Sequence, residues 1–289
     1  MIGPLCHGRR FKGVRLTASM PAHVTANVER FMGFANTYDK YRPQPPMVLI
    51  DILLQLAQIK HPRLVVDLGS GTGLSTCIWT NRADSVIGIE PSADMRHIAE
   101  ENARQMPNSN VRYQNGYSHD TGLADTCADI VTCSQSLHWM EPEPTFAEVA
   151  RILRPGGLFA AIDCDWPPTM NWQAEEAYAQ FDEQGKKLGE ARGFYRDVKQ
   201  WDKEGHLKRM QASGQFRFTK EIVVHHSEMG NAERLVGLAL SQGGVATVLK
   251  RGLTEEEIGV PEFRATVQRV LGDTPSPWYF SYRVRYAIK

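Results

Sequence analysis

An acidic residue followed by three alternating glycines is the pattern in this sequence that most clearly implies ligand binding. A short β-branched apolar run, 64–68, includes Asp67, and the residues that follow are Gly69, Ser70, Gly71, Thr72 and Gly73. This pattern predicts a buried strand that turns tightly into a helix over 74–80, with the backbone approaching a ligand closely. Backbone N–H groups at such a turn favour a carboxylate, and Asp67 suits an ammonium group, so we expect a zwitterionic ligand.

A second acid ends the next apolar run, 85–89, at Glu90. If the two predicted strands are neighbours, Glu90 reaches the glycine turn, where a carboxylate can accept hydrogen bonds from both hydroxyls of a ribose. The dinucleotide-binding fingerprint requires glycine or alanine at position 74, and this chain has Leu74. These residues therefore favour a ligand that combines a ribose with an amino-acid group.

The glycine turn resembles motif I of the class I S-adenosylmethionine-dependent methyltransferases. Three other stretches are similar to the type 11 small-molecule group of that class, over roughly 31–165. Tyr38-Asp39-Lys40-Tyr41-Arg42-Pro43 resembles a segment that covers the cofactor in this group, and Gln135 to Trp139 resembles its segment after the fourth strand. Arg154-Pro155-Gly156-Gly157 stops one helix and begins the next strand, as in the family.

The resemblance implies a set of residues for S-adenosyl-L-methionine and a set for the methyl acceptor. The cofactor-binding positions that it implies are Asp67, Gly69, Ser70, Gly71, Gly73, Glu90, Met95, Gly116, Tyr117, Ser118, Ser134 and Gln135. The lid and acceptor positions are Tyr38, Tyr41, Arg42, Trp139 and Trp166. Each aromatic residue has a second interpretation as core filling, and Met95 does also.

His138 is the candidate catalytic residue, because an imidazole can act as a general base near neutral pH. The alternative is a hydrogen-bonded scaffold histidine beside Trp139. Methyl transfer from a sulfonium needs a base only when the acceptor is poorly ionised, so the sequence need not contain one.

The order of the predicted elements indicates a Rossmann-like, doubly wound α/β fold. We expect strands at 64–68, 85–90, 110–115, 128–133, 158–163, 216–224 and 278–288, the last with a strict period of two. The resemblance implies a seven-stranded sheet whose final strand is antiparallel and inserted between the fifth and sixth. Helices are expected over 22–35 as an N-terminal lid, and over 173–190, 195–212, 235–239 and 254–271 as an inserted C-terminal cap.

The expected organisation is a single methyltransferase domain over 21–289. Within it, 31–165 form the cofactor-binding core, and 166–215 and 228–275 contribute cap elements. Residues 1–20 contain basic residues and no acid. We interpret them as a disordered leader; a presequence or a misassigned start at Met20 are the alternatives.

The composition excludes several classes of protein. Thirty-three basic residues balance 33 acidic ones, so no net charge attracts nucleic acid or an anionic membrane, and no run of apolar residues has transmembrane length. Five dispersed cysteines indicate reduced thiols in a cytoplasmic protein. His225 and His226 point to opposite strand faces and no acid pair follows the fourth strand, so no metal is expected. We expect a monomer or homodimer.

Three alternative functions are weighed against a small-molecule methyltransferase. A nicotinamide-dependent oxidoreductase fits the fold but not Leu74. An RNA or protein methyltransferase fits the cofactor site, but the neutral charge and the absence of an added binding module disfavour it. A non-catalytic scaffold is disfavoured by the intact Asp67, glycines and Glu90.

Overall fold

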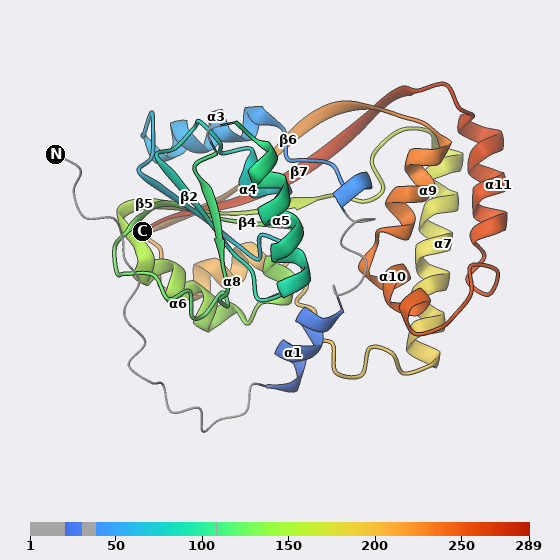
Figure 1. Ribbon diagram of the computed structural model, residues 1–289, viewed down its shortest axis with the longest axis horizontal. Coiled ribbons are helices and arrows are strands. Elements are labelled where there is room, and N and C mark those ends of the chain that lie inside the picture. The colour runs from blue at the N-terminus through green and yellow to red at the C-terminus, as the bar shows by residue number, and fades with distance from the viewer. Residues whose placement is uncertain (1–20, 31–38, 108) are drawn as a thin grey trace.

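The computed structural model describes residues 21–30, 39–107 and 109–289 of the 289-residue chain, and these form a twisted sheet with helices on both faces and a helical cap (Figure 1). The sheet has seven strands in the order β3-β2-β1-β4-β5-β7-β6. The strands are β1 (Leu64–Leu68), β2 (Ser85–Ile89), β3 (Val111–Gln114), β4 (Ala128–Ser134), β5 (Leu153–Cys164), β6 (Phe218–Gly230) and β7 (Ser276–Ile288).

Strands β1 to β5 are parallel, and β7 runs antiparallel to both β5 and β6. This confirms the predicted seven-stranded fold with a final antiparallel strand inserted between the fifth and sixth. All five residues of β1 are buried, as expected for a central parallel strand that is covered on both faces. The strand order reverses between β1 and β4. The loops that follow these two strands therefore lie on opposite sides of a crevice at their carboxyl ends.

Helices cover the two faces of the sheet and form two separate apolar cores. One core joins α3 (Met47–Ala57) to the cap, and the other joins the sheet to α6 (Pro142–Ile152) and α8 (His206–Ala212). Three short elements border the carboxyl ends of the strands: α1 (Ala22–Glu29), α4 (Leu74–Cys77) and a 3-10 turn, η1 (Leu137–Trp139). The remaining helix on the sheet, α5 (Ala93–Gln105), contacts β3.

The cap is a bundle of four helices attached to the sheet by the long β6–β7 ribbon (Figure 1). Its helices are α7 (Trp172–Ala191), α9 (Ala232–Leu240), α10 (Gly243–Lys250) and α11 (Val260–Leu271). The rings of Phe181 on α7 and Phe263 on α11 stack with centroids 4.6 Å apart. Both rings belong to the core that also contains α3, so the cap packs onto the same apolar core as one face of the sheet.

Several element boundaries differ from the sequence expectations. The helix expected over 195–212 occupies only 206–212, because Asp202 accepts hydrogen bonds from the backbone N–H groups of Glu204 and Gly205 and forms a turn there. Strand β6 extends to Gly230, since it stays paired with β7 along its whole length. The N-terminal helix expected over 22–35 ends at Glu29, and 31–38 lie outside the described residues, as does the expected leader.

Within the described ranges, no helix combines the length and the apolar character needed to cross a membrane.

Candidate functional site

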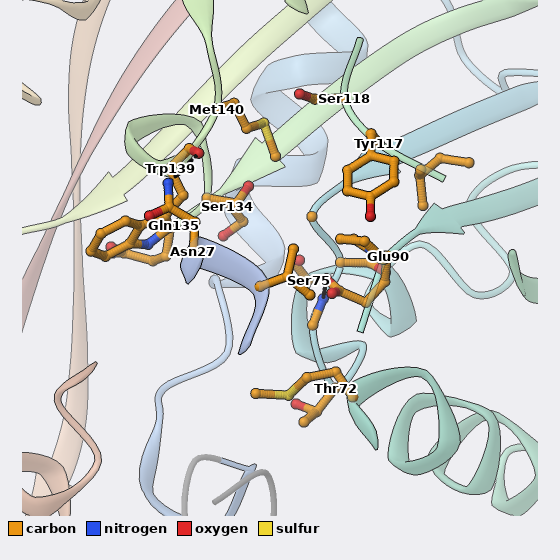
Figure 2. Close-up of a pocket in the computed structure, with 18 of the residues that line it drawn as sticks. Asn27, Thr72, Ser75, Glu90, Tyr117, Ser118, Ser134, Gln135, Trp139 and Met140 are labelled. Carbon is orange, nitrogen blue, oxygen red and sulfur yellow. Dashed lines mark hydrogen bonds between the residues drawn. The ribbon is translucent and has the colours of Figure 1, made fainter. Parts of the chain in front are cut away.

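A cavity of about 560 Å³ opens at the carboxyl ends of β1, β2, β4 and β5. Figure 2 shows its residues in two groups: Thr72, Ser75, Glu90 and Tyr117 lie on one side, and Gln135 and Trp139 lie with Asn27 on the other. We call these the glycine-loop side and the aromatic side. This position, at the crevice where the strand order reverses, is where open parallel sheets bind ligands.

The loop after β1 presents backbone and hydroxyl groups to the glycine-loop side. Gly71 has a φ of +56°, and a Cβ built on it would have no protein atom within 4 Å, so its backbone borders open space. The hydroxyls of Ser70 and Thr72 are buried and have no hydrogen-bond partner in the part of the chain that the structure describes. Because unpartnered buried hydroxyls are costly, this loop fits a ligand that supplies polar groups.

Glu90 lies at the carboxyl end of β2 and connects that strand to the glycine loop. One carboxylate oxygen accepts a hydrogen bond from the backbone N–H of Gly71 at 3.0 Å, and the other accepts from Ser92 N–H at 2.8 Å. Burial raises the pKa of this carboxyl group above its usual value, against those two hydrogen bonds. A carboxylate has about four lone-pair sites, so Glu90 keeps acceptor capacity toward the cavity.

Asp67 does not line the cavity, which differs from the sequence expectation that its carboxylate meets an ammonium group. Its side chain is fully buried beneath the loop and accepts hydrogen bonds from three hydroxyls, those of Ser75, Thr76 and Thr132. Burial raises the pKa of the Asp67 carboxyl, and the three hydroxyls oppose that rise. Asp67 therefore connects β1, α4 and β4 and shapes the loop from below.

Gly73 also lies behind the loop surface. It has a φ of +89°, and a Cβ at this position would overlap the hydroxyl of Tyr113 on β3. The third glycine is thus required by backbone conformation and by Tyr113. The other glycine-loop positions expected to bind a cofactor, Gly69 and Ser70, line the cavity with Gly71.

The residues that follow β2 and β3 form the far wall of the glycine-loop side. Met95, Gly116, Tyr117 and Ser118, which the sequence predicts to bind the cofactor, all line the cavity. The Tyr117 ring stacks on His119 with centroids 5.6 Å apart, and the Ser118 hydroxyl bonds to the Thr145 hydroxyl at 2.8 Å. This wall offers a flat aromatic surface and backbone groups suited to a purine ring.

Ser134 and Gln135, at the end of β4, both line the cavity, and Gln135 lies on the aromatic side. Gln135 has a φ of +52°, which is unusual for a residue other than glycine and occurs often at functional sites. Its side-chain oxygen accepts a hydrogen bond from Lys203 Nζ at 2.9 Å, and its amide nitrogen donates to the Cys164 carbonyl at 3.4 Å. Neighbouring groups therefore orient this amide at the cavity wall.

The aromatic side is built from segments far apart in the sequence. Trp139, Trp166 and Arg42, which the sequence predicts as lid or acceptor residues, line it. Tyr41 does not line the cavity; it packs against Gly237 of the cap, as the core-filling interpretation predicts. Tyr38, the remaining lid residue, lies outside the described residues.

Helix α1 closes this side through Asn27, whose side chain is buried. The amide donates to the carbonyls of Trp139 and Lys199, at 3.0 and 2.8 Å, and accepts from Lys199 N–H at 3.1 Å. His23, one turn earlier, lies 3.3 Å from Glu141 at the edge of the cavity. Sequence reasoning missed Asn27, because nothing in its surroundings distinguishes it from any polar residue on an amphipathic helix.

His138, the candidate base, is buried and does not line the cavity. Its Nδ1 lies 3.7 Å from a carboxylate oxygen of Asp163, and burial lowers the pKa of the imidazole to about 4. Burial opposes ionisation of Asp163 as well, but its interactions with His138 and Lys203 outweigh that effect and hold its pKa well below the usual range. The geometry favours the scaffold interpretation of His138.

Asp163 is the centre of a buried polar cluster that the sequence did not predict. Lys203 Nζ lies 3.3 Å from one of its oxygens, and Arg285 Nη1 lies 2.8 Å from the other. His138, Asp163 and His206 have ligand-type atoms within 4.8 Å of one another, which is a spacing that could hold a metal ion. The three residues are too far apart in the sequence for spacing to reveal the cluster.

The protons in this cluster disfavour a metal. Arg209 Nη2 lies 2.9 Å from His206 Nδ1. A guanidinium can only donate, so Nδ1 must be the acceptor, and the neutral His206 ring then carries its proton on Nε2, the atom that faces Asp163. A metal ion would have to displace that proton and approach two cations, so we interpret the cluster as donors gathered around one carboxylate.

Other cavity residues were also missed. Thr72 and Ser75 could have been inferred, because hydroxyls in a glycine turn commonly bind polar ligands. Cys164 and Tyr282 line the aromatic side from β5 and β7. Only the pairing of those two strands brings them together, so no local pattern identifies them.

Comparison with known proteins shows which proteins this chain is similar to. Residues 66–161 match the family model described as "Methyltransferase domain". The chain is 30% identical over 145 residues to the uncharacterized methyltransferase Rv3342 of Mycobacterium tuberculosis, covering 50% of this chain and 56% of that protein. It is 33% identical over 143 residues to malonyl-[acyl-carrier protein] O-methyltransferase of Nitrosospira multiformis, covering 43% and 47%. The chain thus spans about half the length of the curated relatives that it matches.

Solved structures agree with the fold. A structure from Anaeromyxobacter dehalogenans, described as a type II methyltransferase, superposes with a TM-score of 0.58 at 19% identity. The superposition covers 86% of this chain and 98% of the other. At this identity the likeness concerns the fold alone.

Proposed function

We propose that this chain, which belongs to the class I S-adenosylmethionine-dependent methyltransferases, transfers a methyl group from S-adenosyl-L-methionine to a small, largely apolar or aromatic acceptor. The observation that carries this proposal is the cavity with two unlike sides. Its glycine-loop side combines an open backbone at Gly71, two hydroxyls that have no hydrogen-bond partner among the described residues, and the Glu90 carboxylate, while its other side is aromatic.

The residues of the glycine-loop side have distinct roles in this proposal. Ser70, Gly71 and Thr72 bind the amino-acid end of the cofactor through backbone N–H and hydroxyl groups. Glu90 accepts hydrogen bonds from the ribose hydroxyls, and Tyr117 and Met95 contact the adenine. Asp67 and Gly73 act from behind the loop by fixing its shape.

S-adenosyl-L-methionine supplies a methyl group on a positively charged sulfur, which is activated for in-line displacement by a nucleophilic O, N, S or C atom. The protein's main contribution is then to align the acceptor and exclude water. Asn27 keeps α1 docked over the aromatic side through its three hydrogen bonds. His138 has no direct part in this mechanism, because it is buried away from the cavity and its pKa is lowered.

The aromatic side supports an apolar or aromatic acceptor. Trp139, Trp166 and Tyr282 supply large contact surfaces with few rotatable bonds to freeze. The malonyl-[acyl-carrier protein] O-methyltransferase among the relatives methylates oxygen, as its name states, which is consistent with an oxygen acceptor here.

Calorimetric titration tests the cofactor, with S-adenosylmethionine and S-adenosylhomocysteine as ligands and NADH as the control. We expect both adenosyl ligands to bind and NADH not to bind. Mass spectrometry of small molecules that co-purify with the protein then identifies candidate acceptors, and formation of S-adenosylhomocysteine with each candidate measures turnover. Binding of NADH without either adenosyl ligand would refute the proposed function.

A further inference from the structure

We propose that two copies of this chain associate through β6, whose outer edges pair antiparallel and join the two sheets into one. β6 is the last strand in the sheet order, and it pairs with β7 over all 13 of its residues. Within the described part of the chain, no backbone group bonds to the other edge of this strand. No residue of β6 lines the cavity, so this inference stands apart from the proposed function.

The strand lacks the usual features that prevent edge pairing. An exposed edge is a template for another strand, and proteins commonly protect it with a proline, a bulge or a short strand. β6 has none of these: residues 218–229 contain no proline or glycine, the register with β7 is continuous, and the strand is about twice the common length. None of residues 218–229 is buried, and Phe218, Val223 and Met229 are among the most exposed large apolar side chains that the structure describes.

The direction of the backbone groups of β6 follows from the pairing of β7. Tyr279 and Thr169 exchange two backbone hydrogen bonds, at 2.8 and 2.9 Å, so the N–H and C=O of Tyr279 point away from β6. Tyr279 lies opposite Ser227, and this pair is therefore not hydrogen-bonded, which leaves the N–H and C=O of Ser227 pointing to the outer edge. Because the direction alternates along a strand, the odd-numbered residues from Thr219 to Ser227 present their backbone groups at this edge, and Val223 is the central one.

Only a register that places odd-numbered residues opposite one another satisfies these groups, and one such register is self-complementary. With Val223 on a two-fold axis, Val223 faces its own copy and Ile222 faces Val224 of the second copy. Glu221 then lies opposite His225 of the second copy, which places a carboxylate beside an imidazole on both sides of the axis. An axis at Val224 would instead place Ile222 and Val223 opposite histidines, so we assign the axis to Val223.

The paired stretch ends before the cap. It runs from Thr219 to Ser227, and Met229 lies beyond it, with its carbonyl accepting a hydrogen bond from Arg234 Nη1 at 2.6 Å. Such a contact is isologous, since the same surface of each copy is used. It therefore closes at two copies and does not extend into a fibre.

Light scattering during size-exclusion chromatography of the full chain tests the proposal across a concentration series. For the unaltered protein we expect twice the 32.5 kDa of one chain. Val223→Pro removes an N–H that points away from β7, so it blocks edge pairing without breaking a β6–β7 hydrogen bond. Val223→Lys places two ammonium groups on the axis. Both variants should have the mass of a single chain.

Val48→Lys is the matched control, because Val48 on α3 is 44% exposed and Val223 is 45% exposed. This variant should keep the dimer mass, and circular dichroism with thermal melting confirms that each variant is folded. A single-chain mass for the unaltered protein, a dimer that persists in Val223→Lys, or loss of the dimer in Val48→Lys would each overturn the proposal. If Val223→Pro does not fold, Val223→Lys decides.

Cross-linking tests the register in a Cys6→Ser chain, whose remaining cysteines are buried. Val223→Cys places the two thiols across the axis, on residues whose Cα atoms are about 5.5 Å apart. Ser227→Cys separates the two thiols by the length of eight residues, about 27 Å. A short bismaleimide should couple the first variant into a covalent dimer and leave the second uncoupled. Coupling of Ser227→Cys without coupling of Val223→Cys would overturn the assignment of the axis.

Discussion

Mild acid should destabilise this protein through His138. Burial lowers the pKa of His138 to about 4, whereas an imidazole in an unfolded chain titrates near 6.5. Between these values the unfolded state binds a proton that the folded state does not. Stability therefore falls as the pH falls from about 6.5 to about 4.

The size of the effect follows from the difference between the folded and unfolded pKa values of His138. A pKa difference of one between the two states corresponds to about 1.4 kcal/mol, so His138 alone accounts for a loss of about 2 kcal/mol between pH 7.5 and 5, and about 3 kcal/mol by pH 4. His206 shares the cluster and has its pKa lowered to about 4, first by burial, so it adds to the loss in the same window. Asp163 acts lower: its depressed pKa gives stability that is lost only as the pH falls below the value near 3.9 of an unfolded aspartate.

Urea unfolding followed by tryptophan fluorescence, repeated at several pH values, measures this loss. His138→Gln keeps polar atoms in the site but cannot titrate, so its stability should vary less with pH by about 2 kcal/mol between pH 7.5 and 5. His97→Gln, an exposed histidine on α5 paired with Glu101, is the matched control and should retain the full dependence. Parallel pH profiles for the unaltered protein and His138→Gln would refute the assignment of acid sensitivity to this residue.

The remaining predictions concern the cavity. Glu90→Ala should weaken S-adenosylmethionine binding by about 1.5–3 kcal/mol in calorimetry, because it removes a charged acceptor; unchanged affinity would contradict our placement of the ribose. Gly71→Val should block cofactor binding and lower the melting temperature through its left-handed φ, whereas Gly73→Val should lower the melting temperature further, because its side chain would also meet Tyr113. Asn27→Leu should speed release of S-adenosylhomocysteine in stopped-flow fluorescence by undocking α1, and an unchanged rate would remove this helix from cofactor retention. EDTA should not reduce turnover, and activity restored by Mg²⁺ after EDTA treatment would show that a metal is needed.

The sheet and the glycine-loop side of the cavity were largely predictable, because both depend on local patterns. A β-branched run followed by glycines fixes the end of β1, and the rule that parallel strands end at one edge brings Glu90 to the same loop. The strict alternation of 278–288 identified β7. The spacing of residues in the sequence does not, however, reveal which groups form hydrogen bonds to a side chain. Asp67 has the expected position on β1, but hydroxyls from α4 and β4 surround its carboxylate.

The aromatic side and the Asp163 cluster could not be predicted in the same way. Arg42 was proposed from a resemblance, but its geometry depends on Ser241 and Gln242, about 200 residues away in the sequence. Tyr282 reaches the cavity only because β7 pairs with β5 in reverse, opposite Cys164. His206 meets Asp163 only because α8 packs against the same sheet face. These contacts arise from tertiary packing between segments that are far apart in the sequence, and no periodic sequence pattern connects such segments.

The two sides of the cavity are built from different segments of the chain, and this affects how substitutions change specificity. The glycine-loop side comes mainly from the loops that follow β1, β2 and β3, within 69–118, and the backbone N–H groups of Gly69 and Ser70 donate to the Ile89 carbonyl of β2. The aromatic side combines α1, the segment at Arg42, the end of β5 and one position on β7, and the cap holds Arg42 through Ser241 and Gln242. A substitution in the cap can therefore move Arg42 without disturbing Glu90 or Gly71. We expect Gln242→Ala to change the preference among acceptors while S-adenosylhomocysteine affinity stays the same. If both affinities changed together in this variant, the two sides would be energetically coupled and our division of the cavity would be wrong.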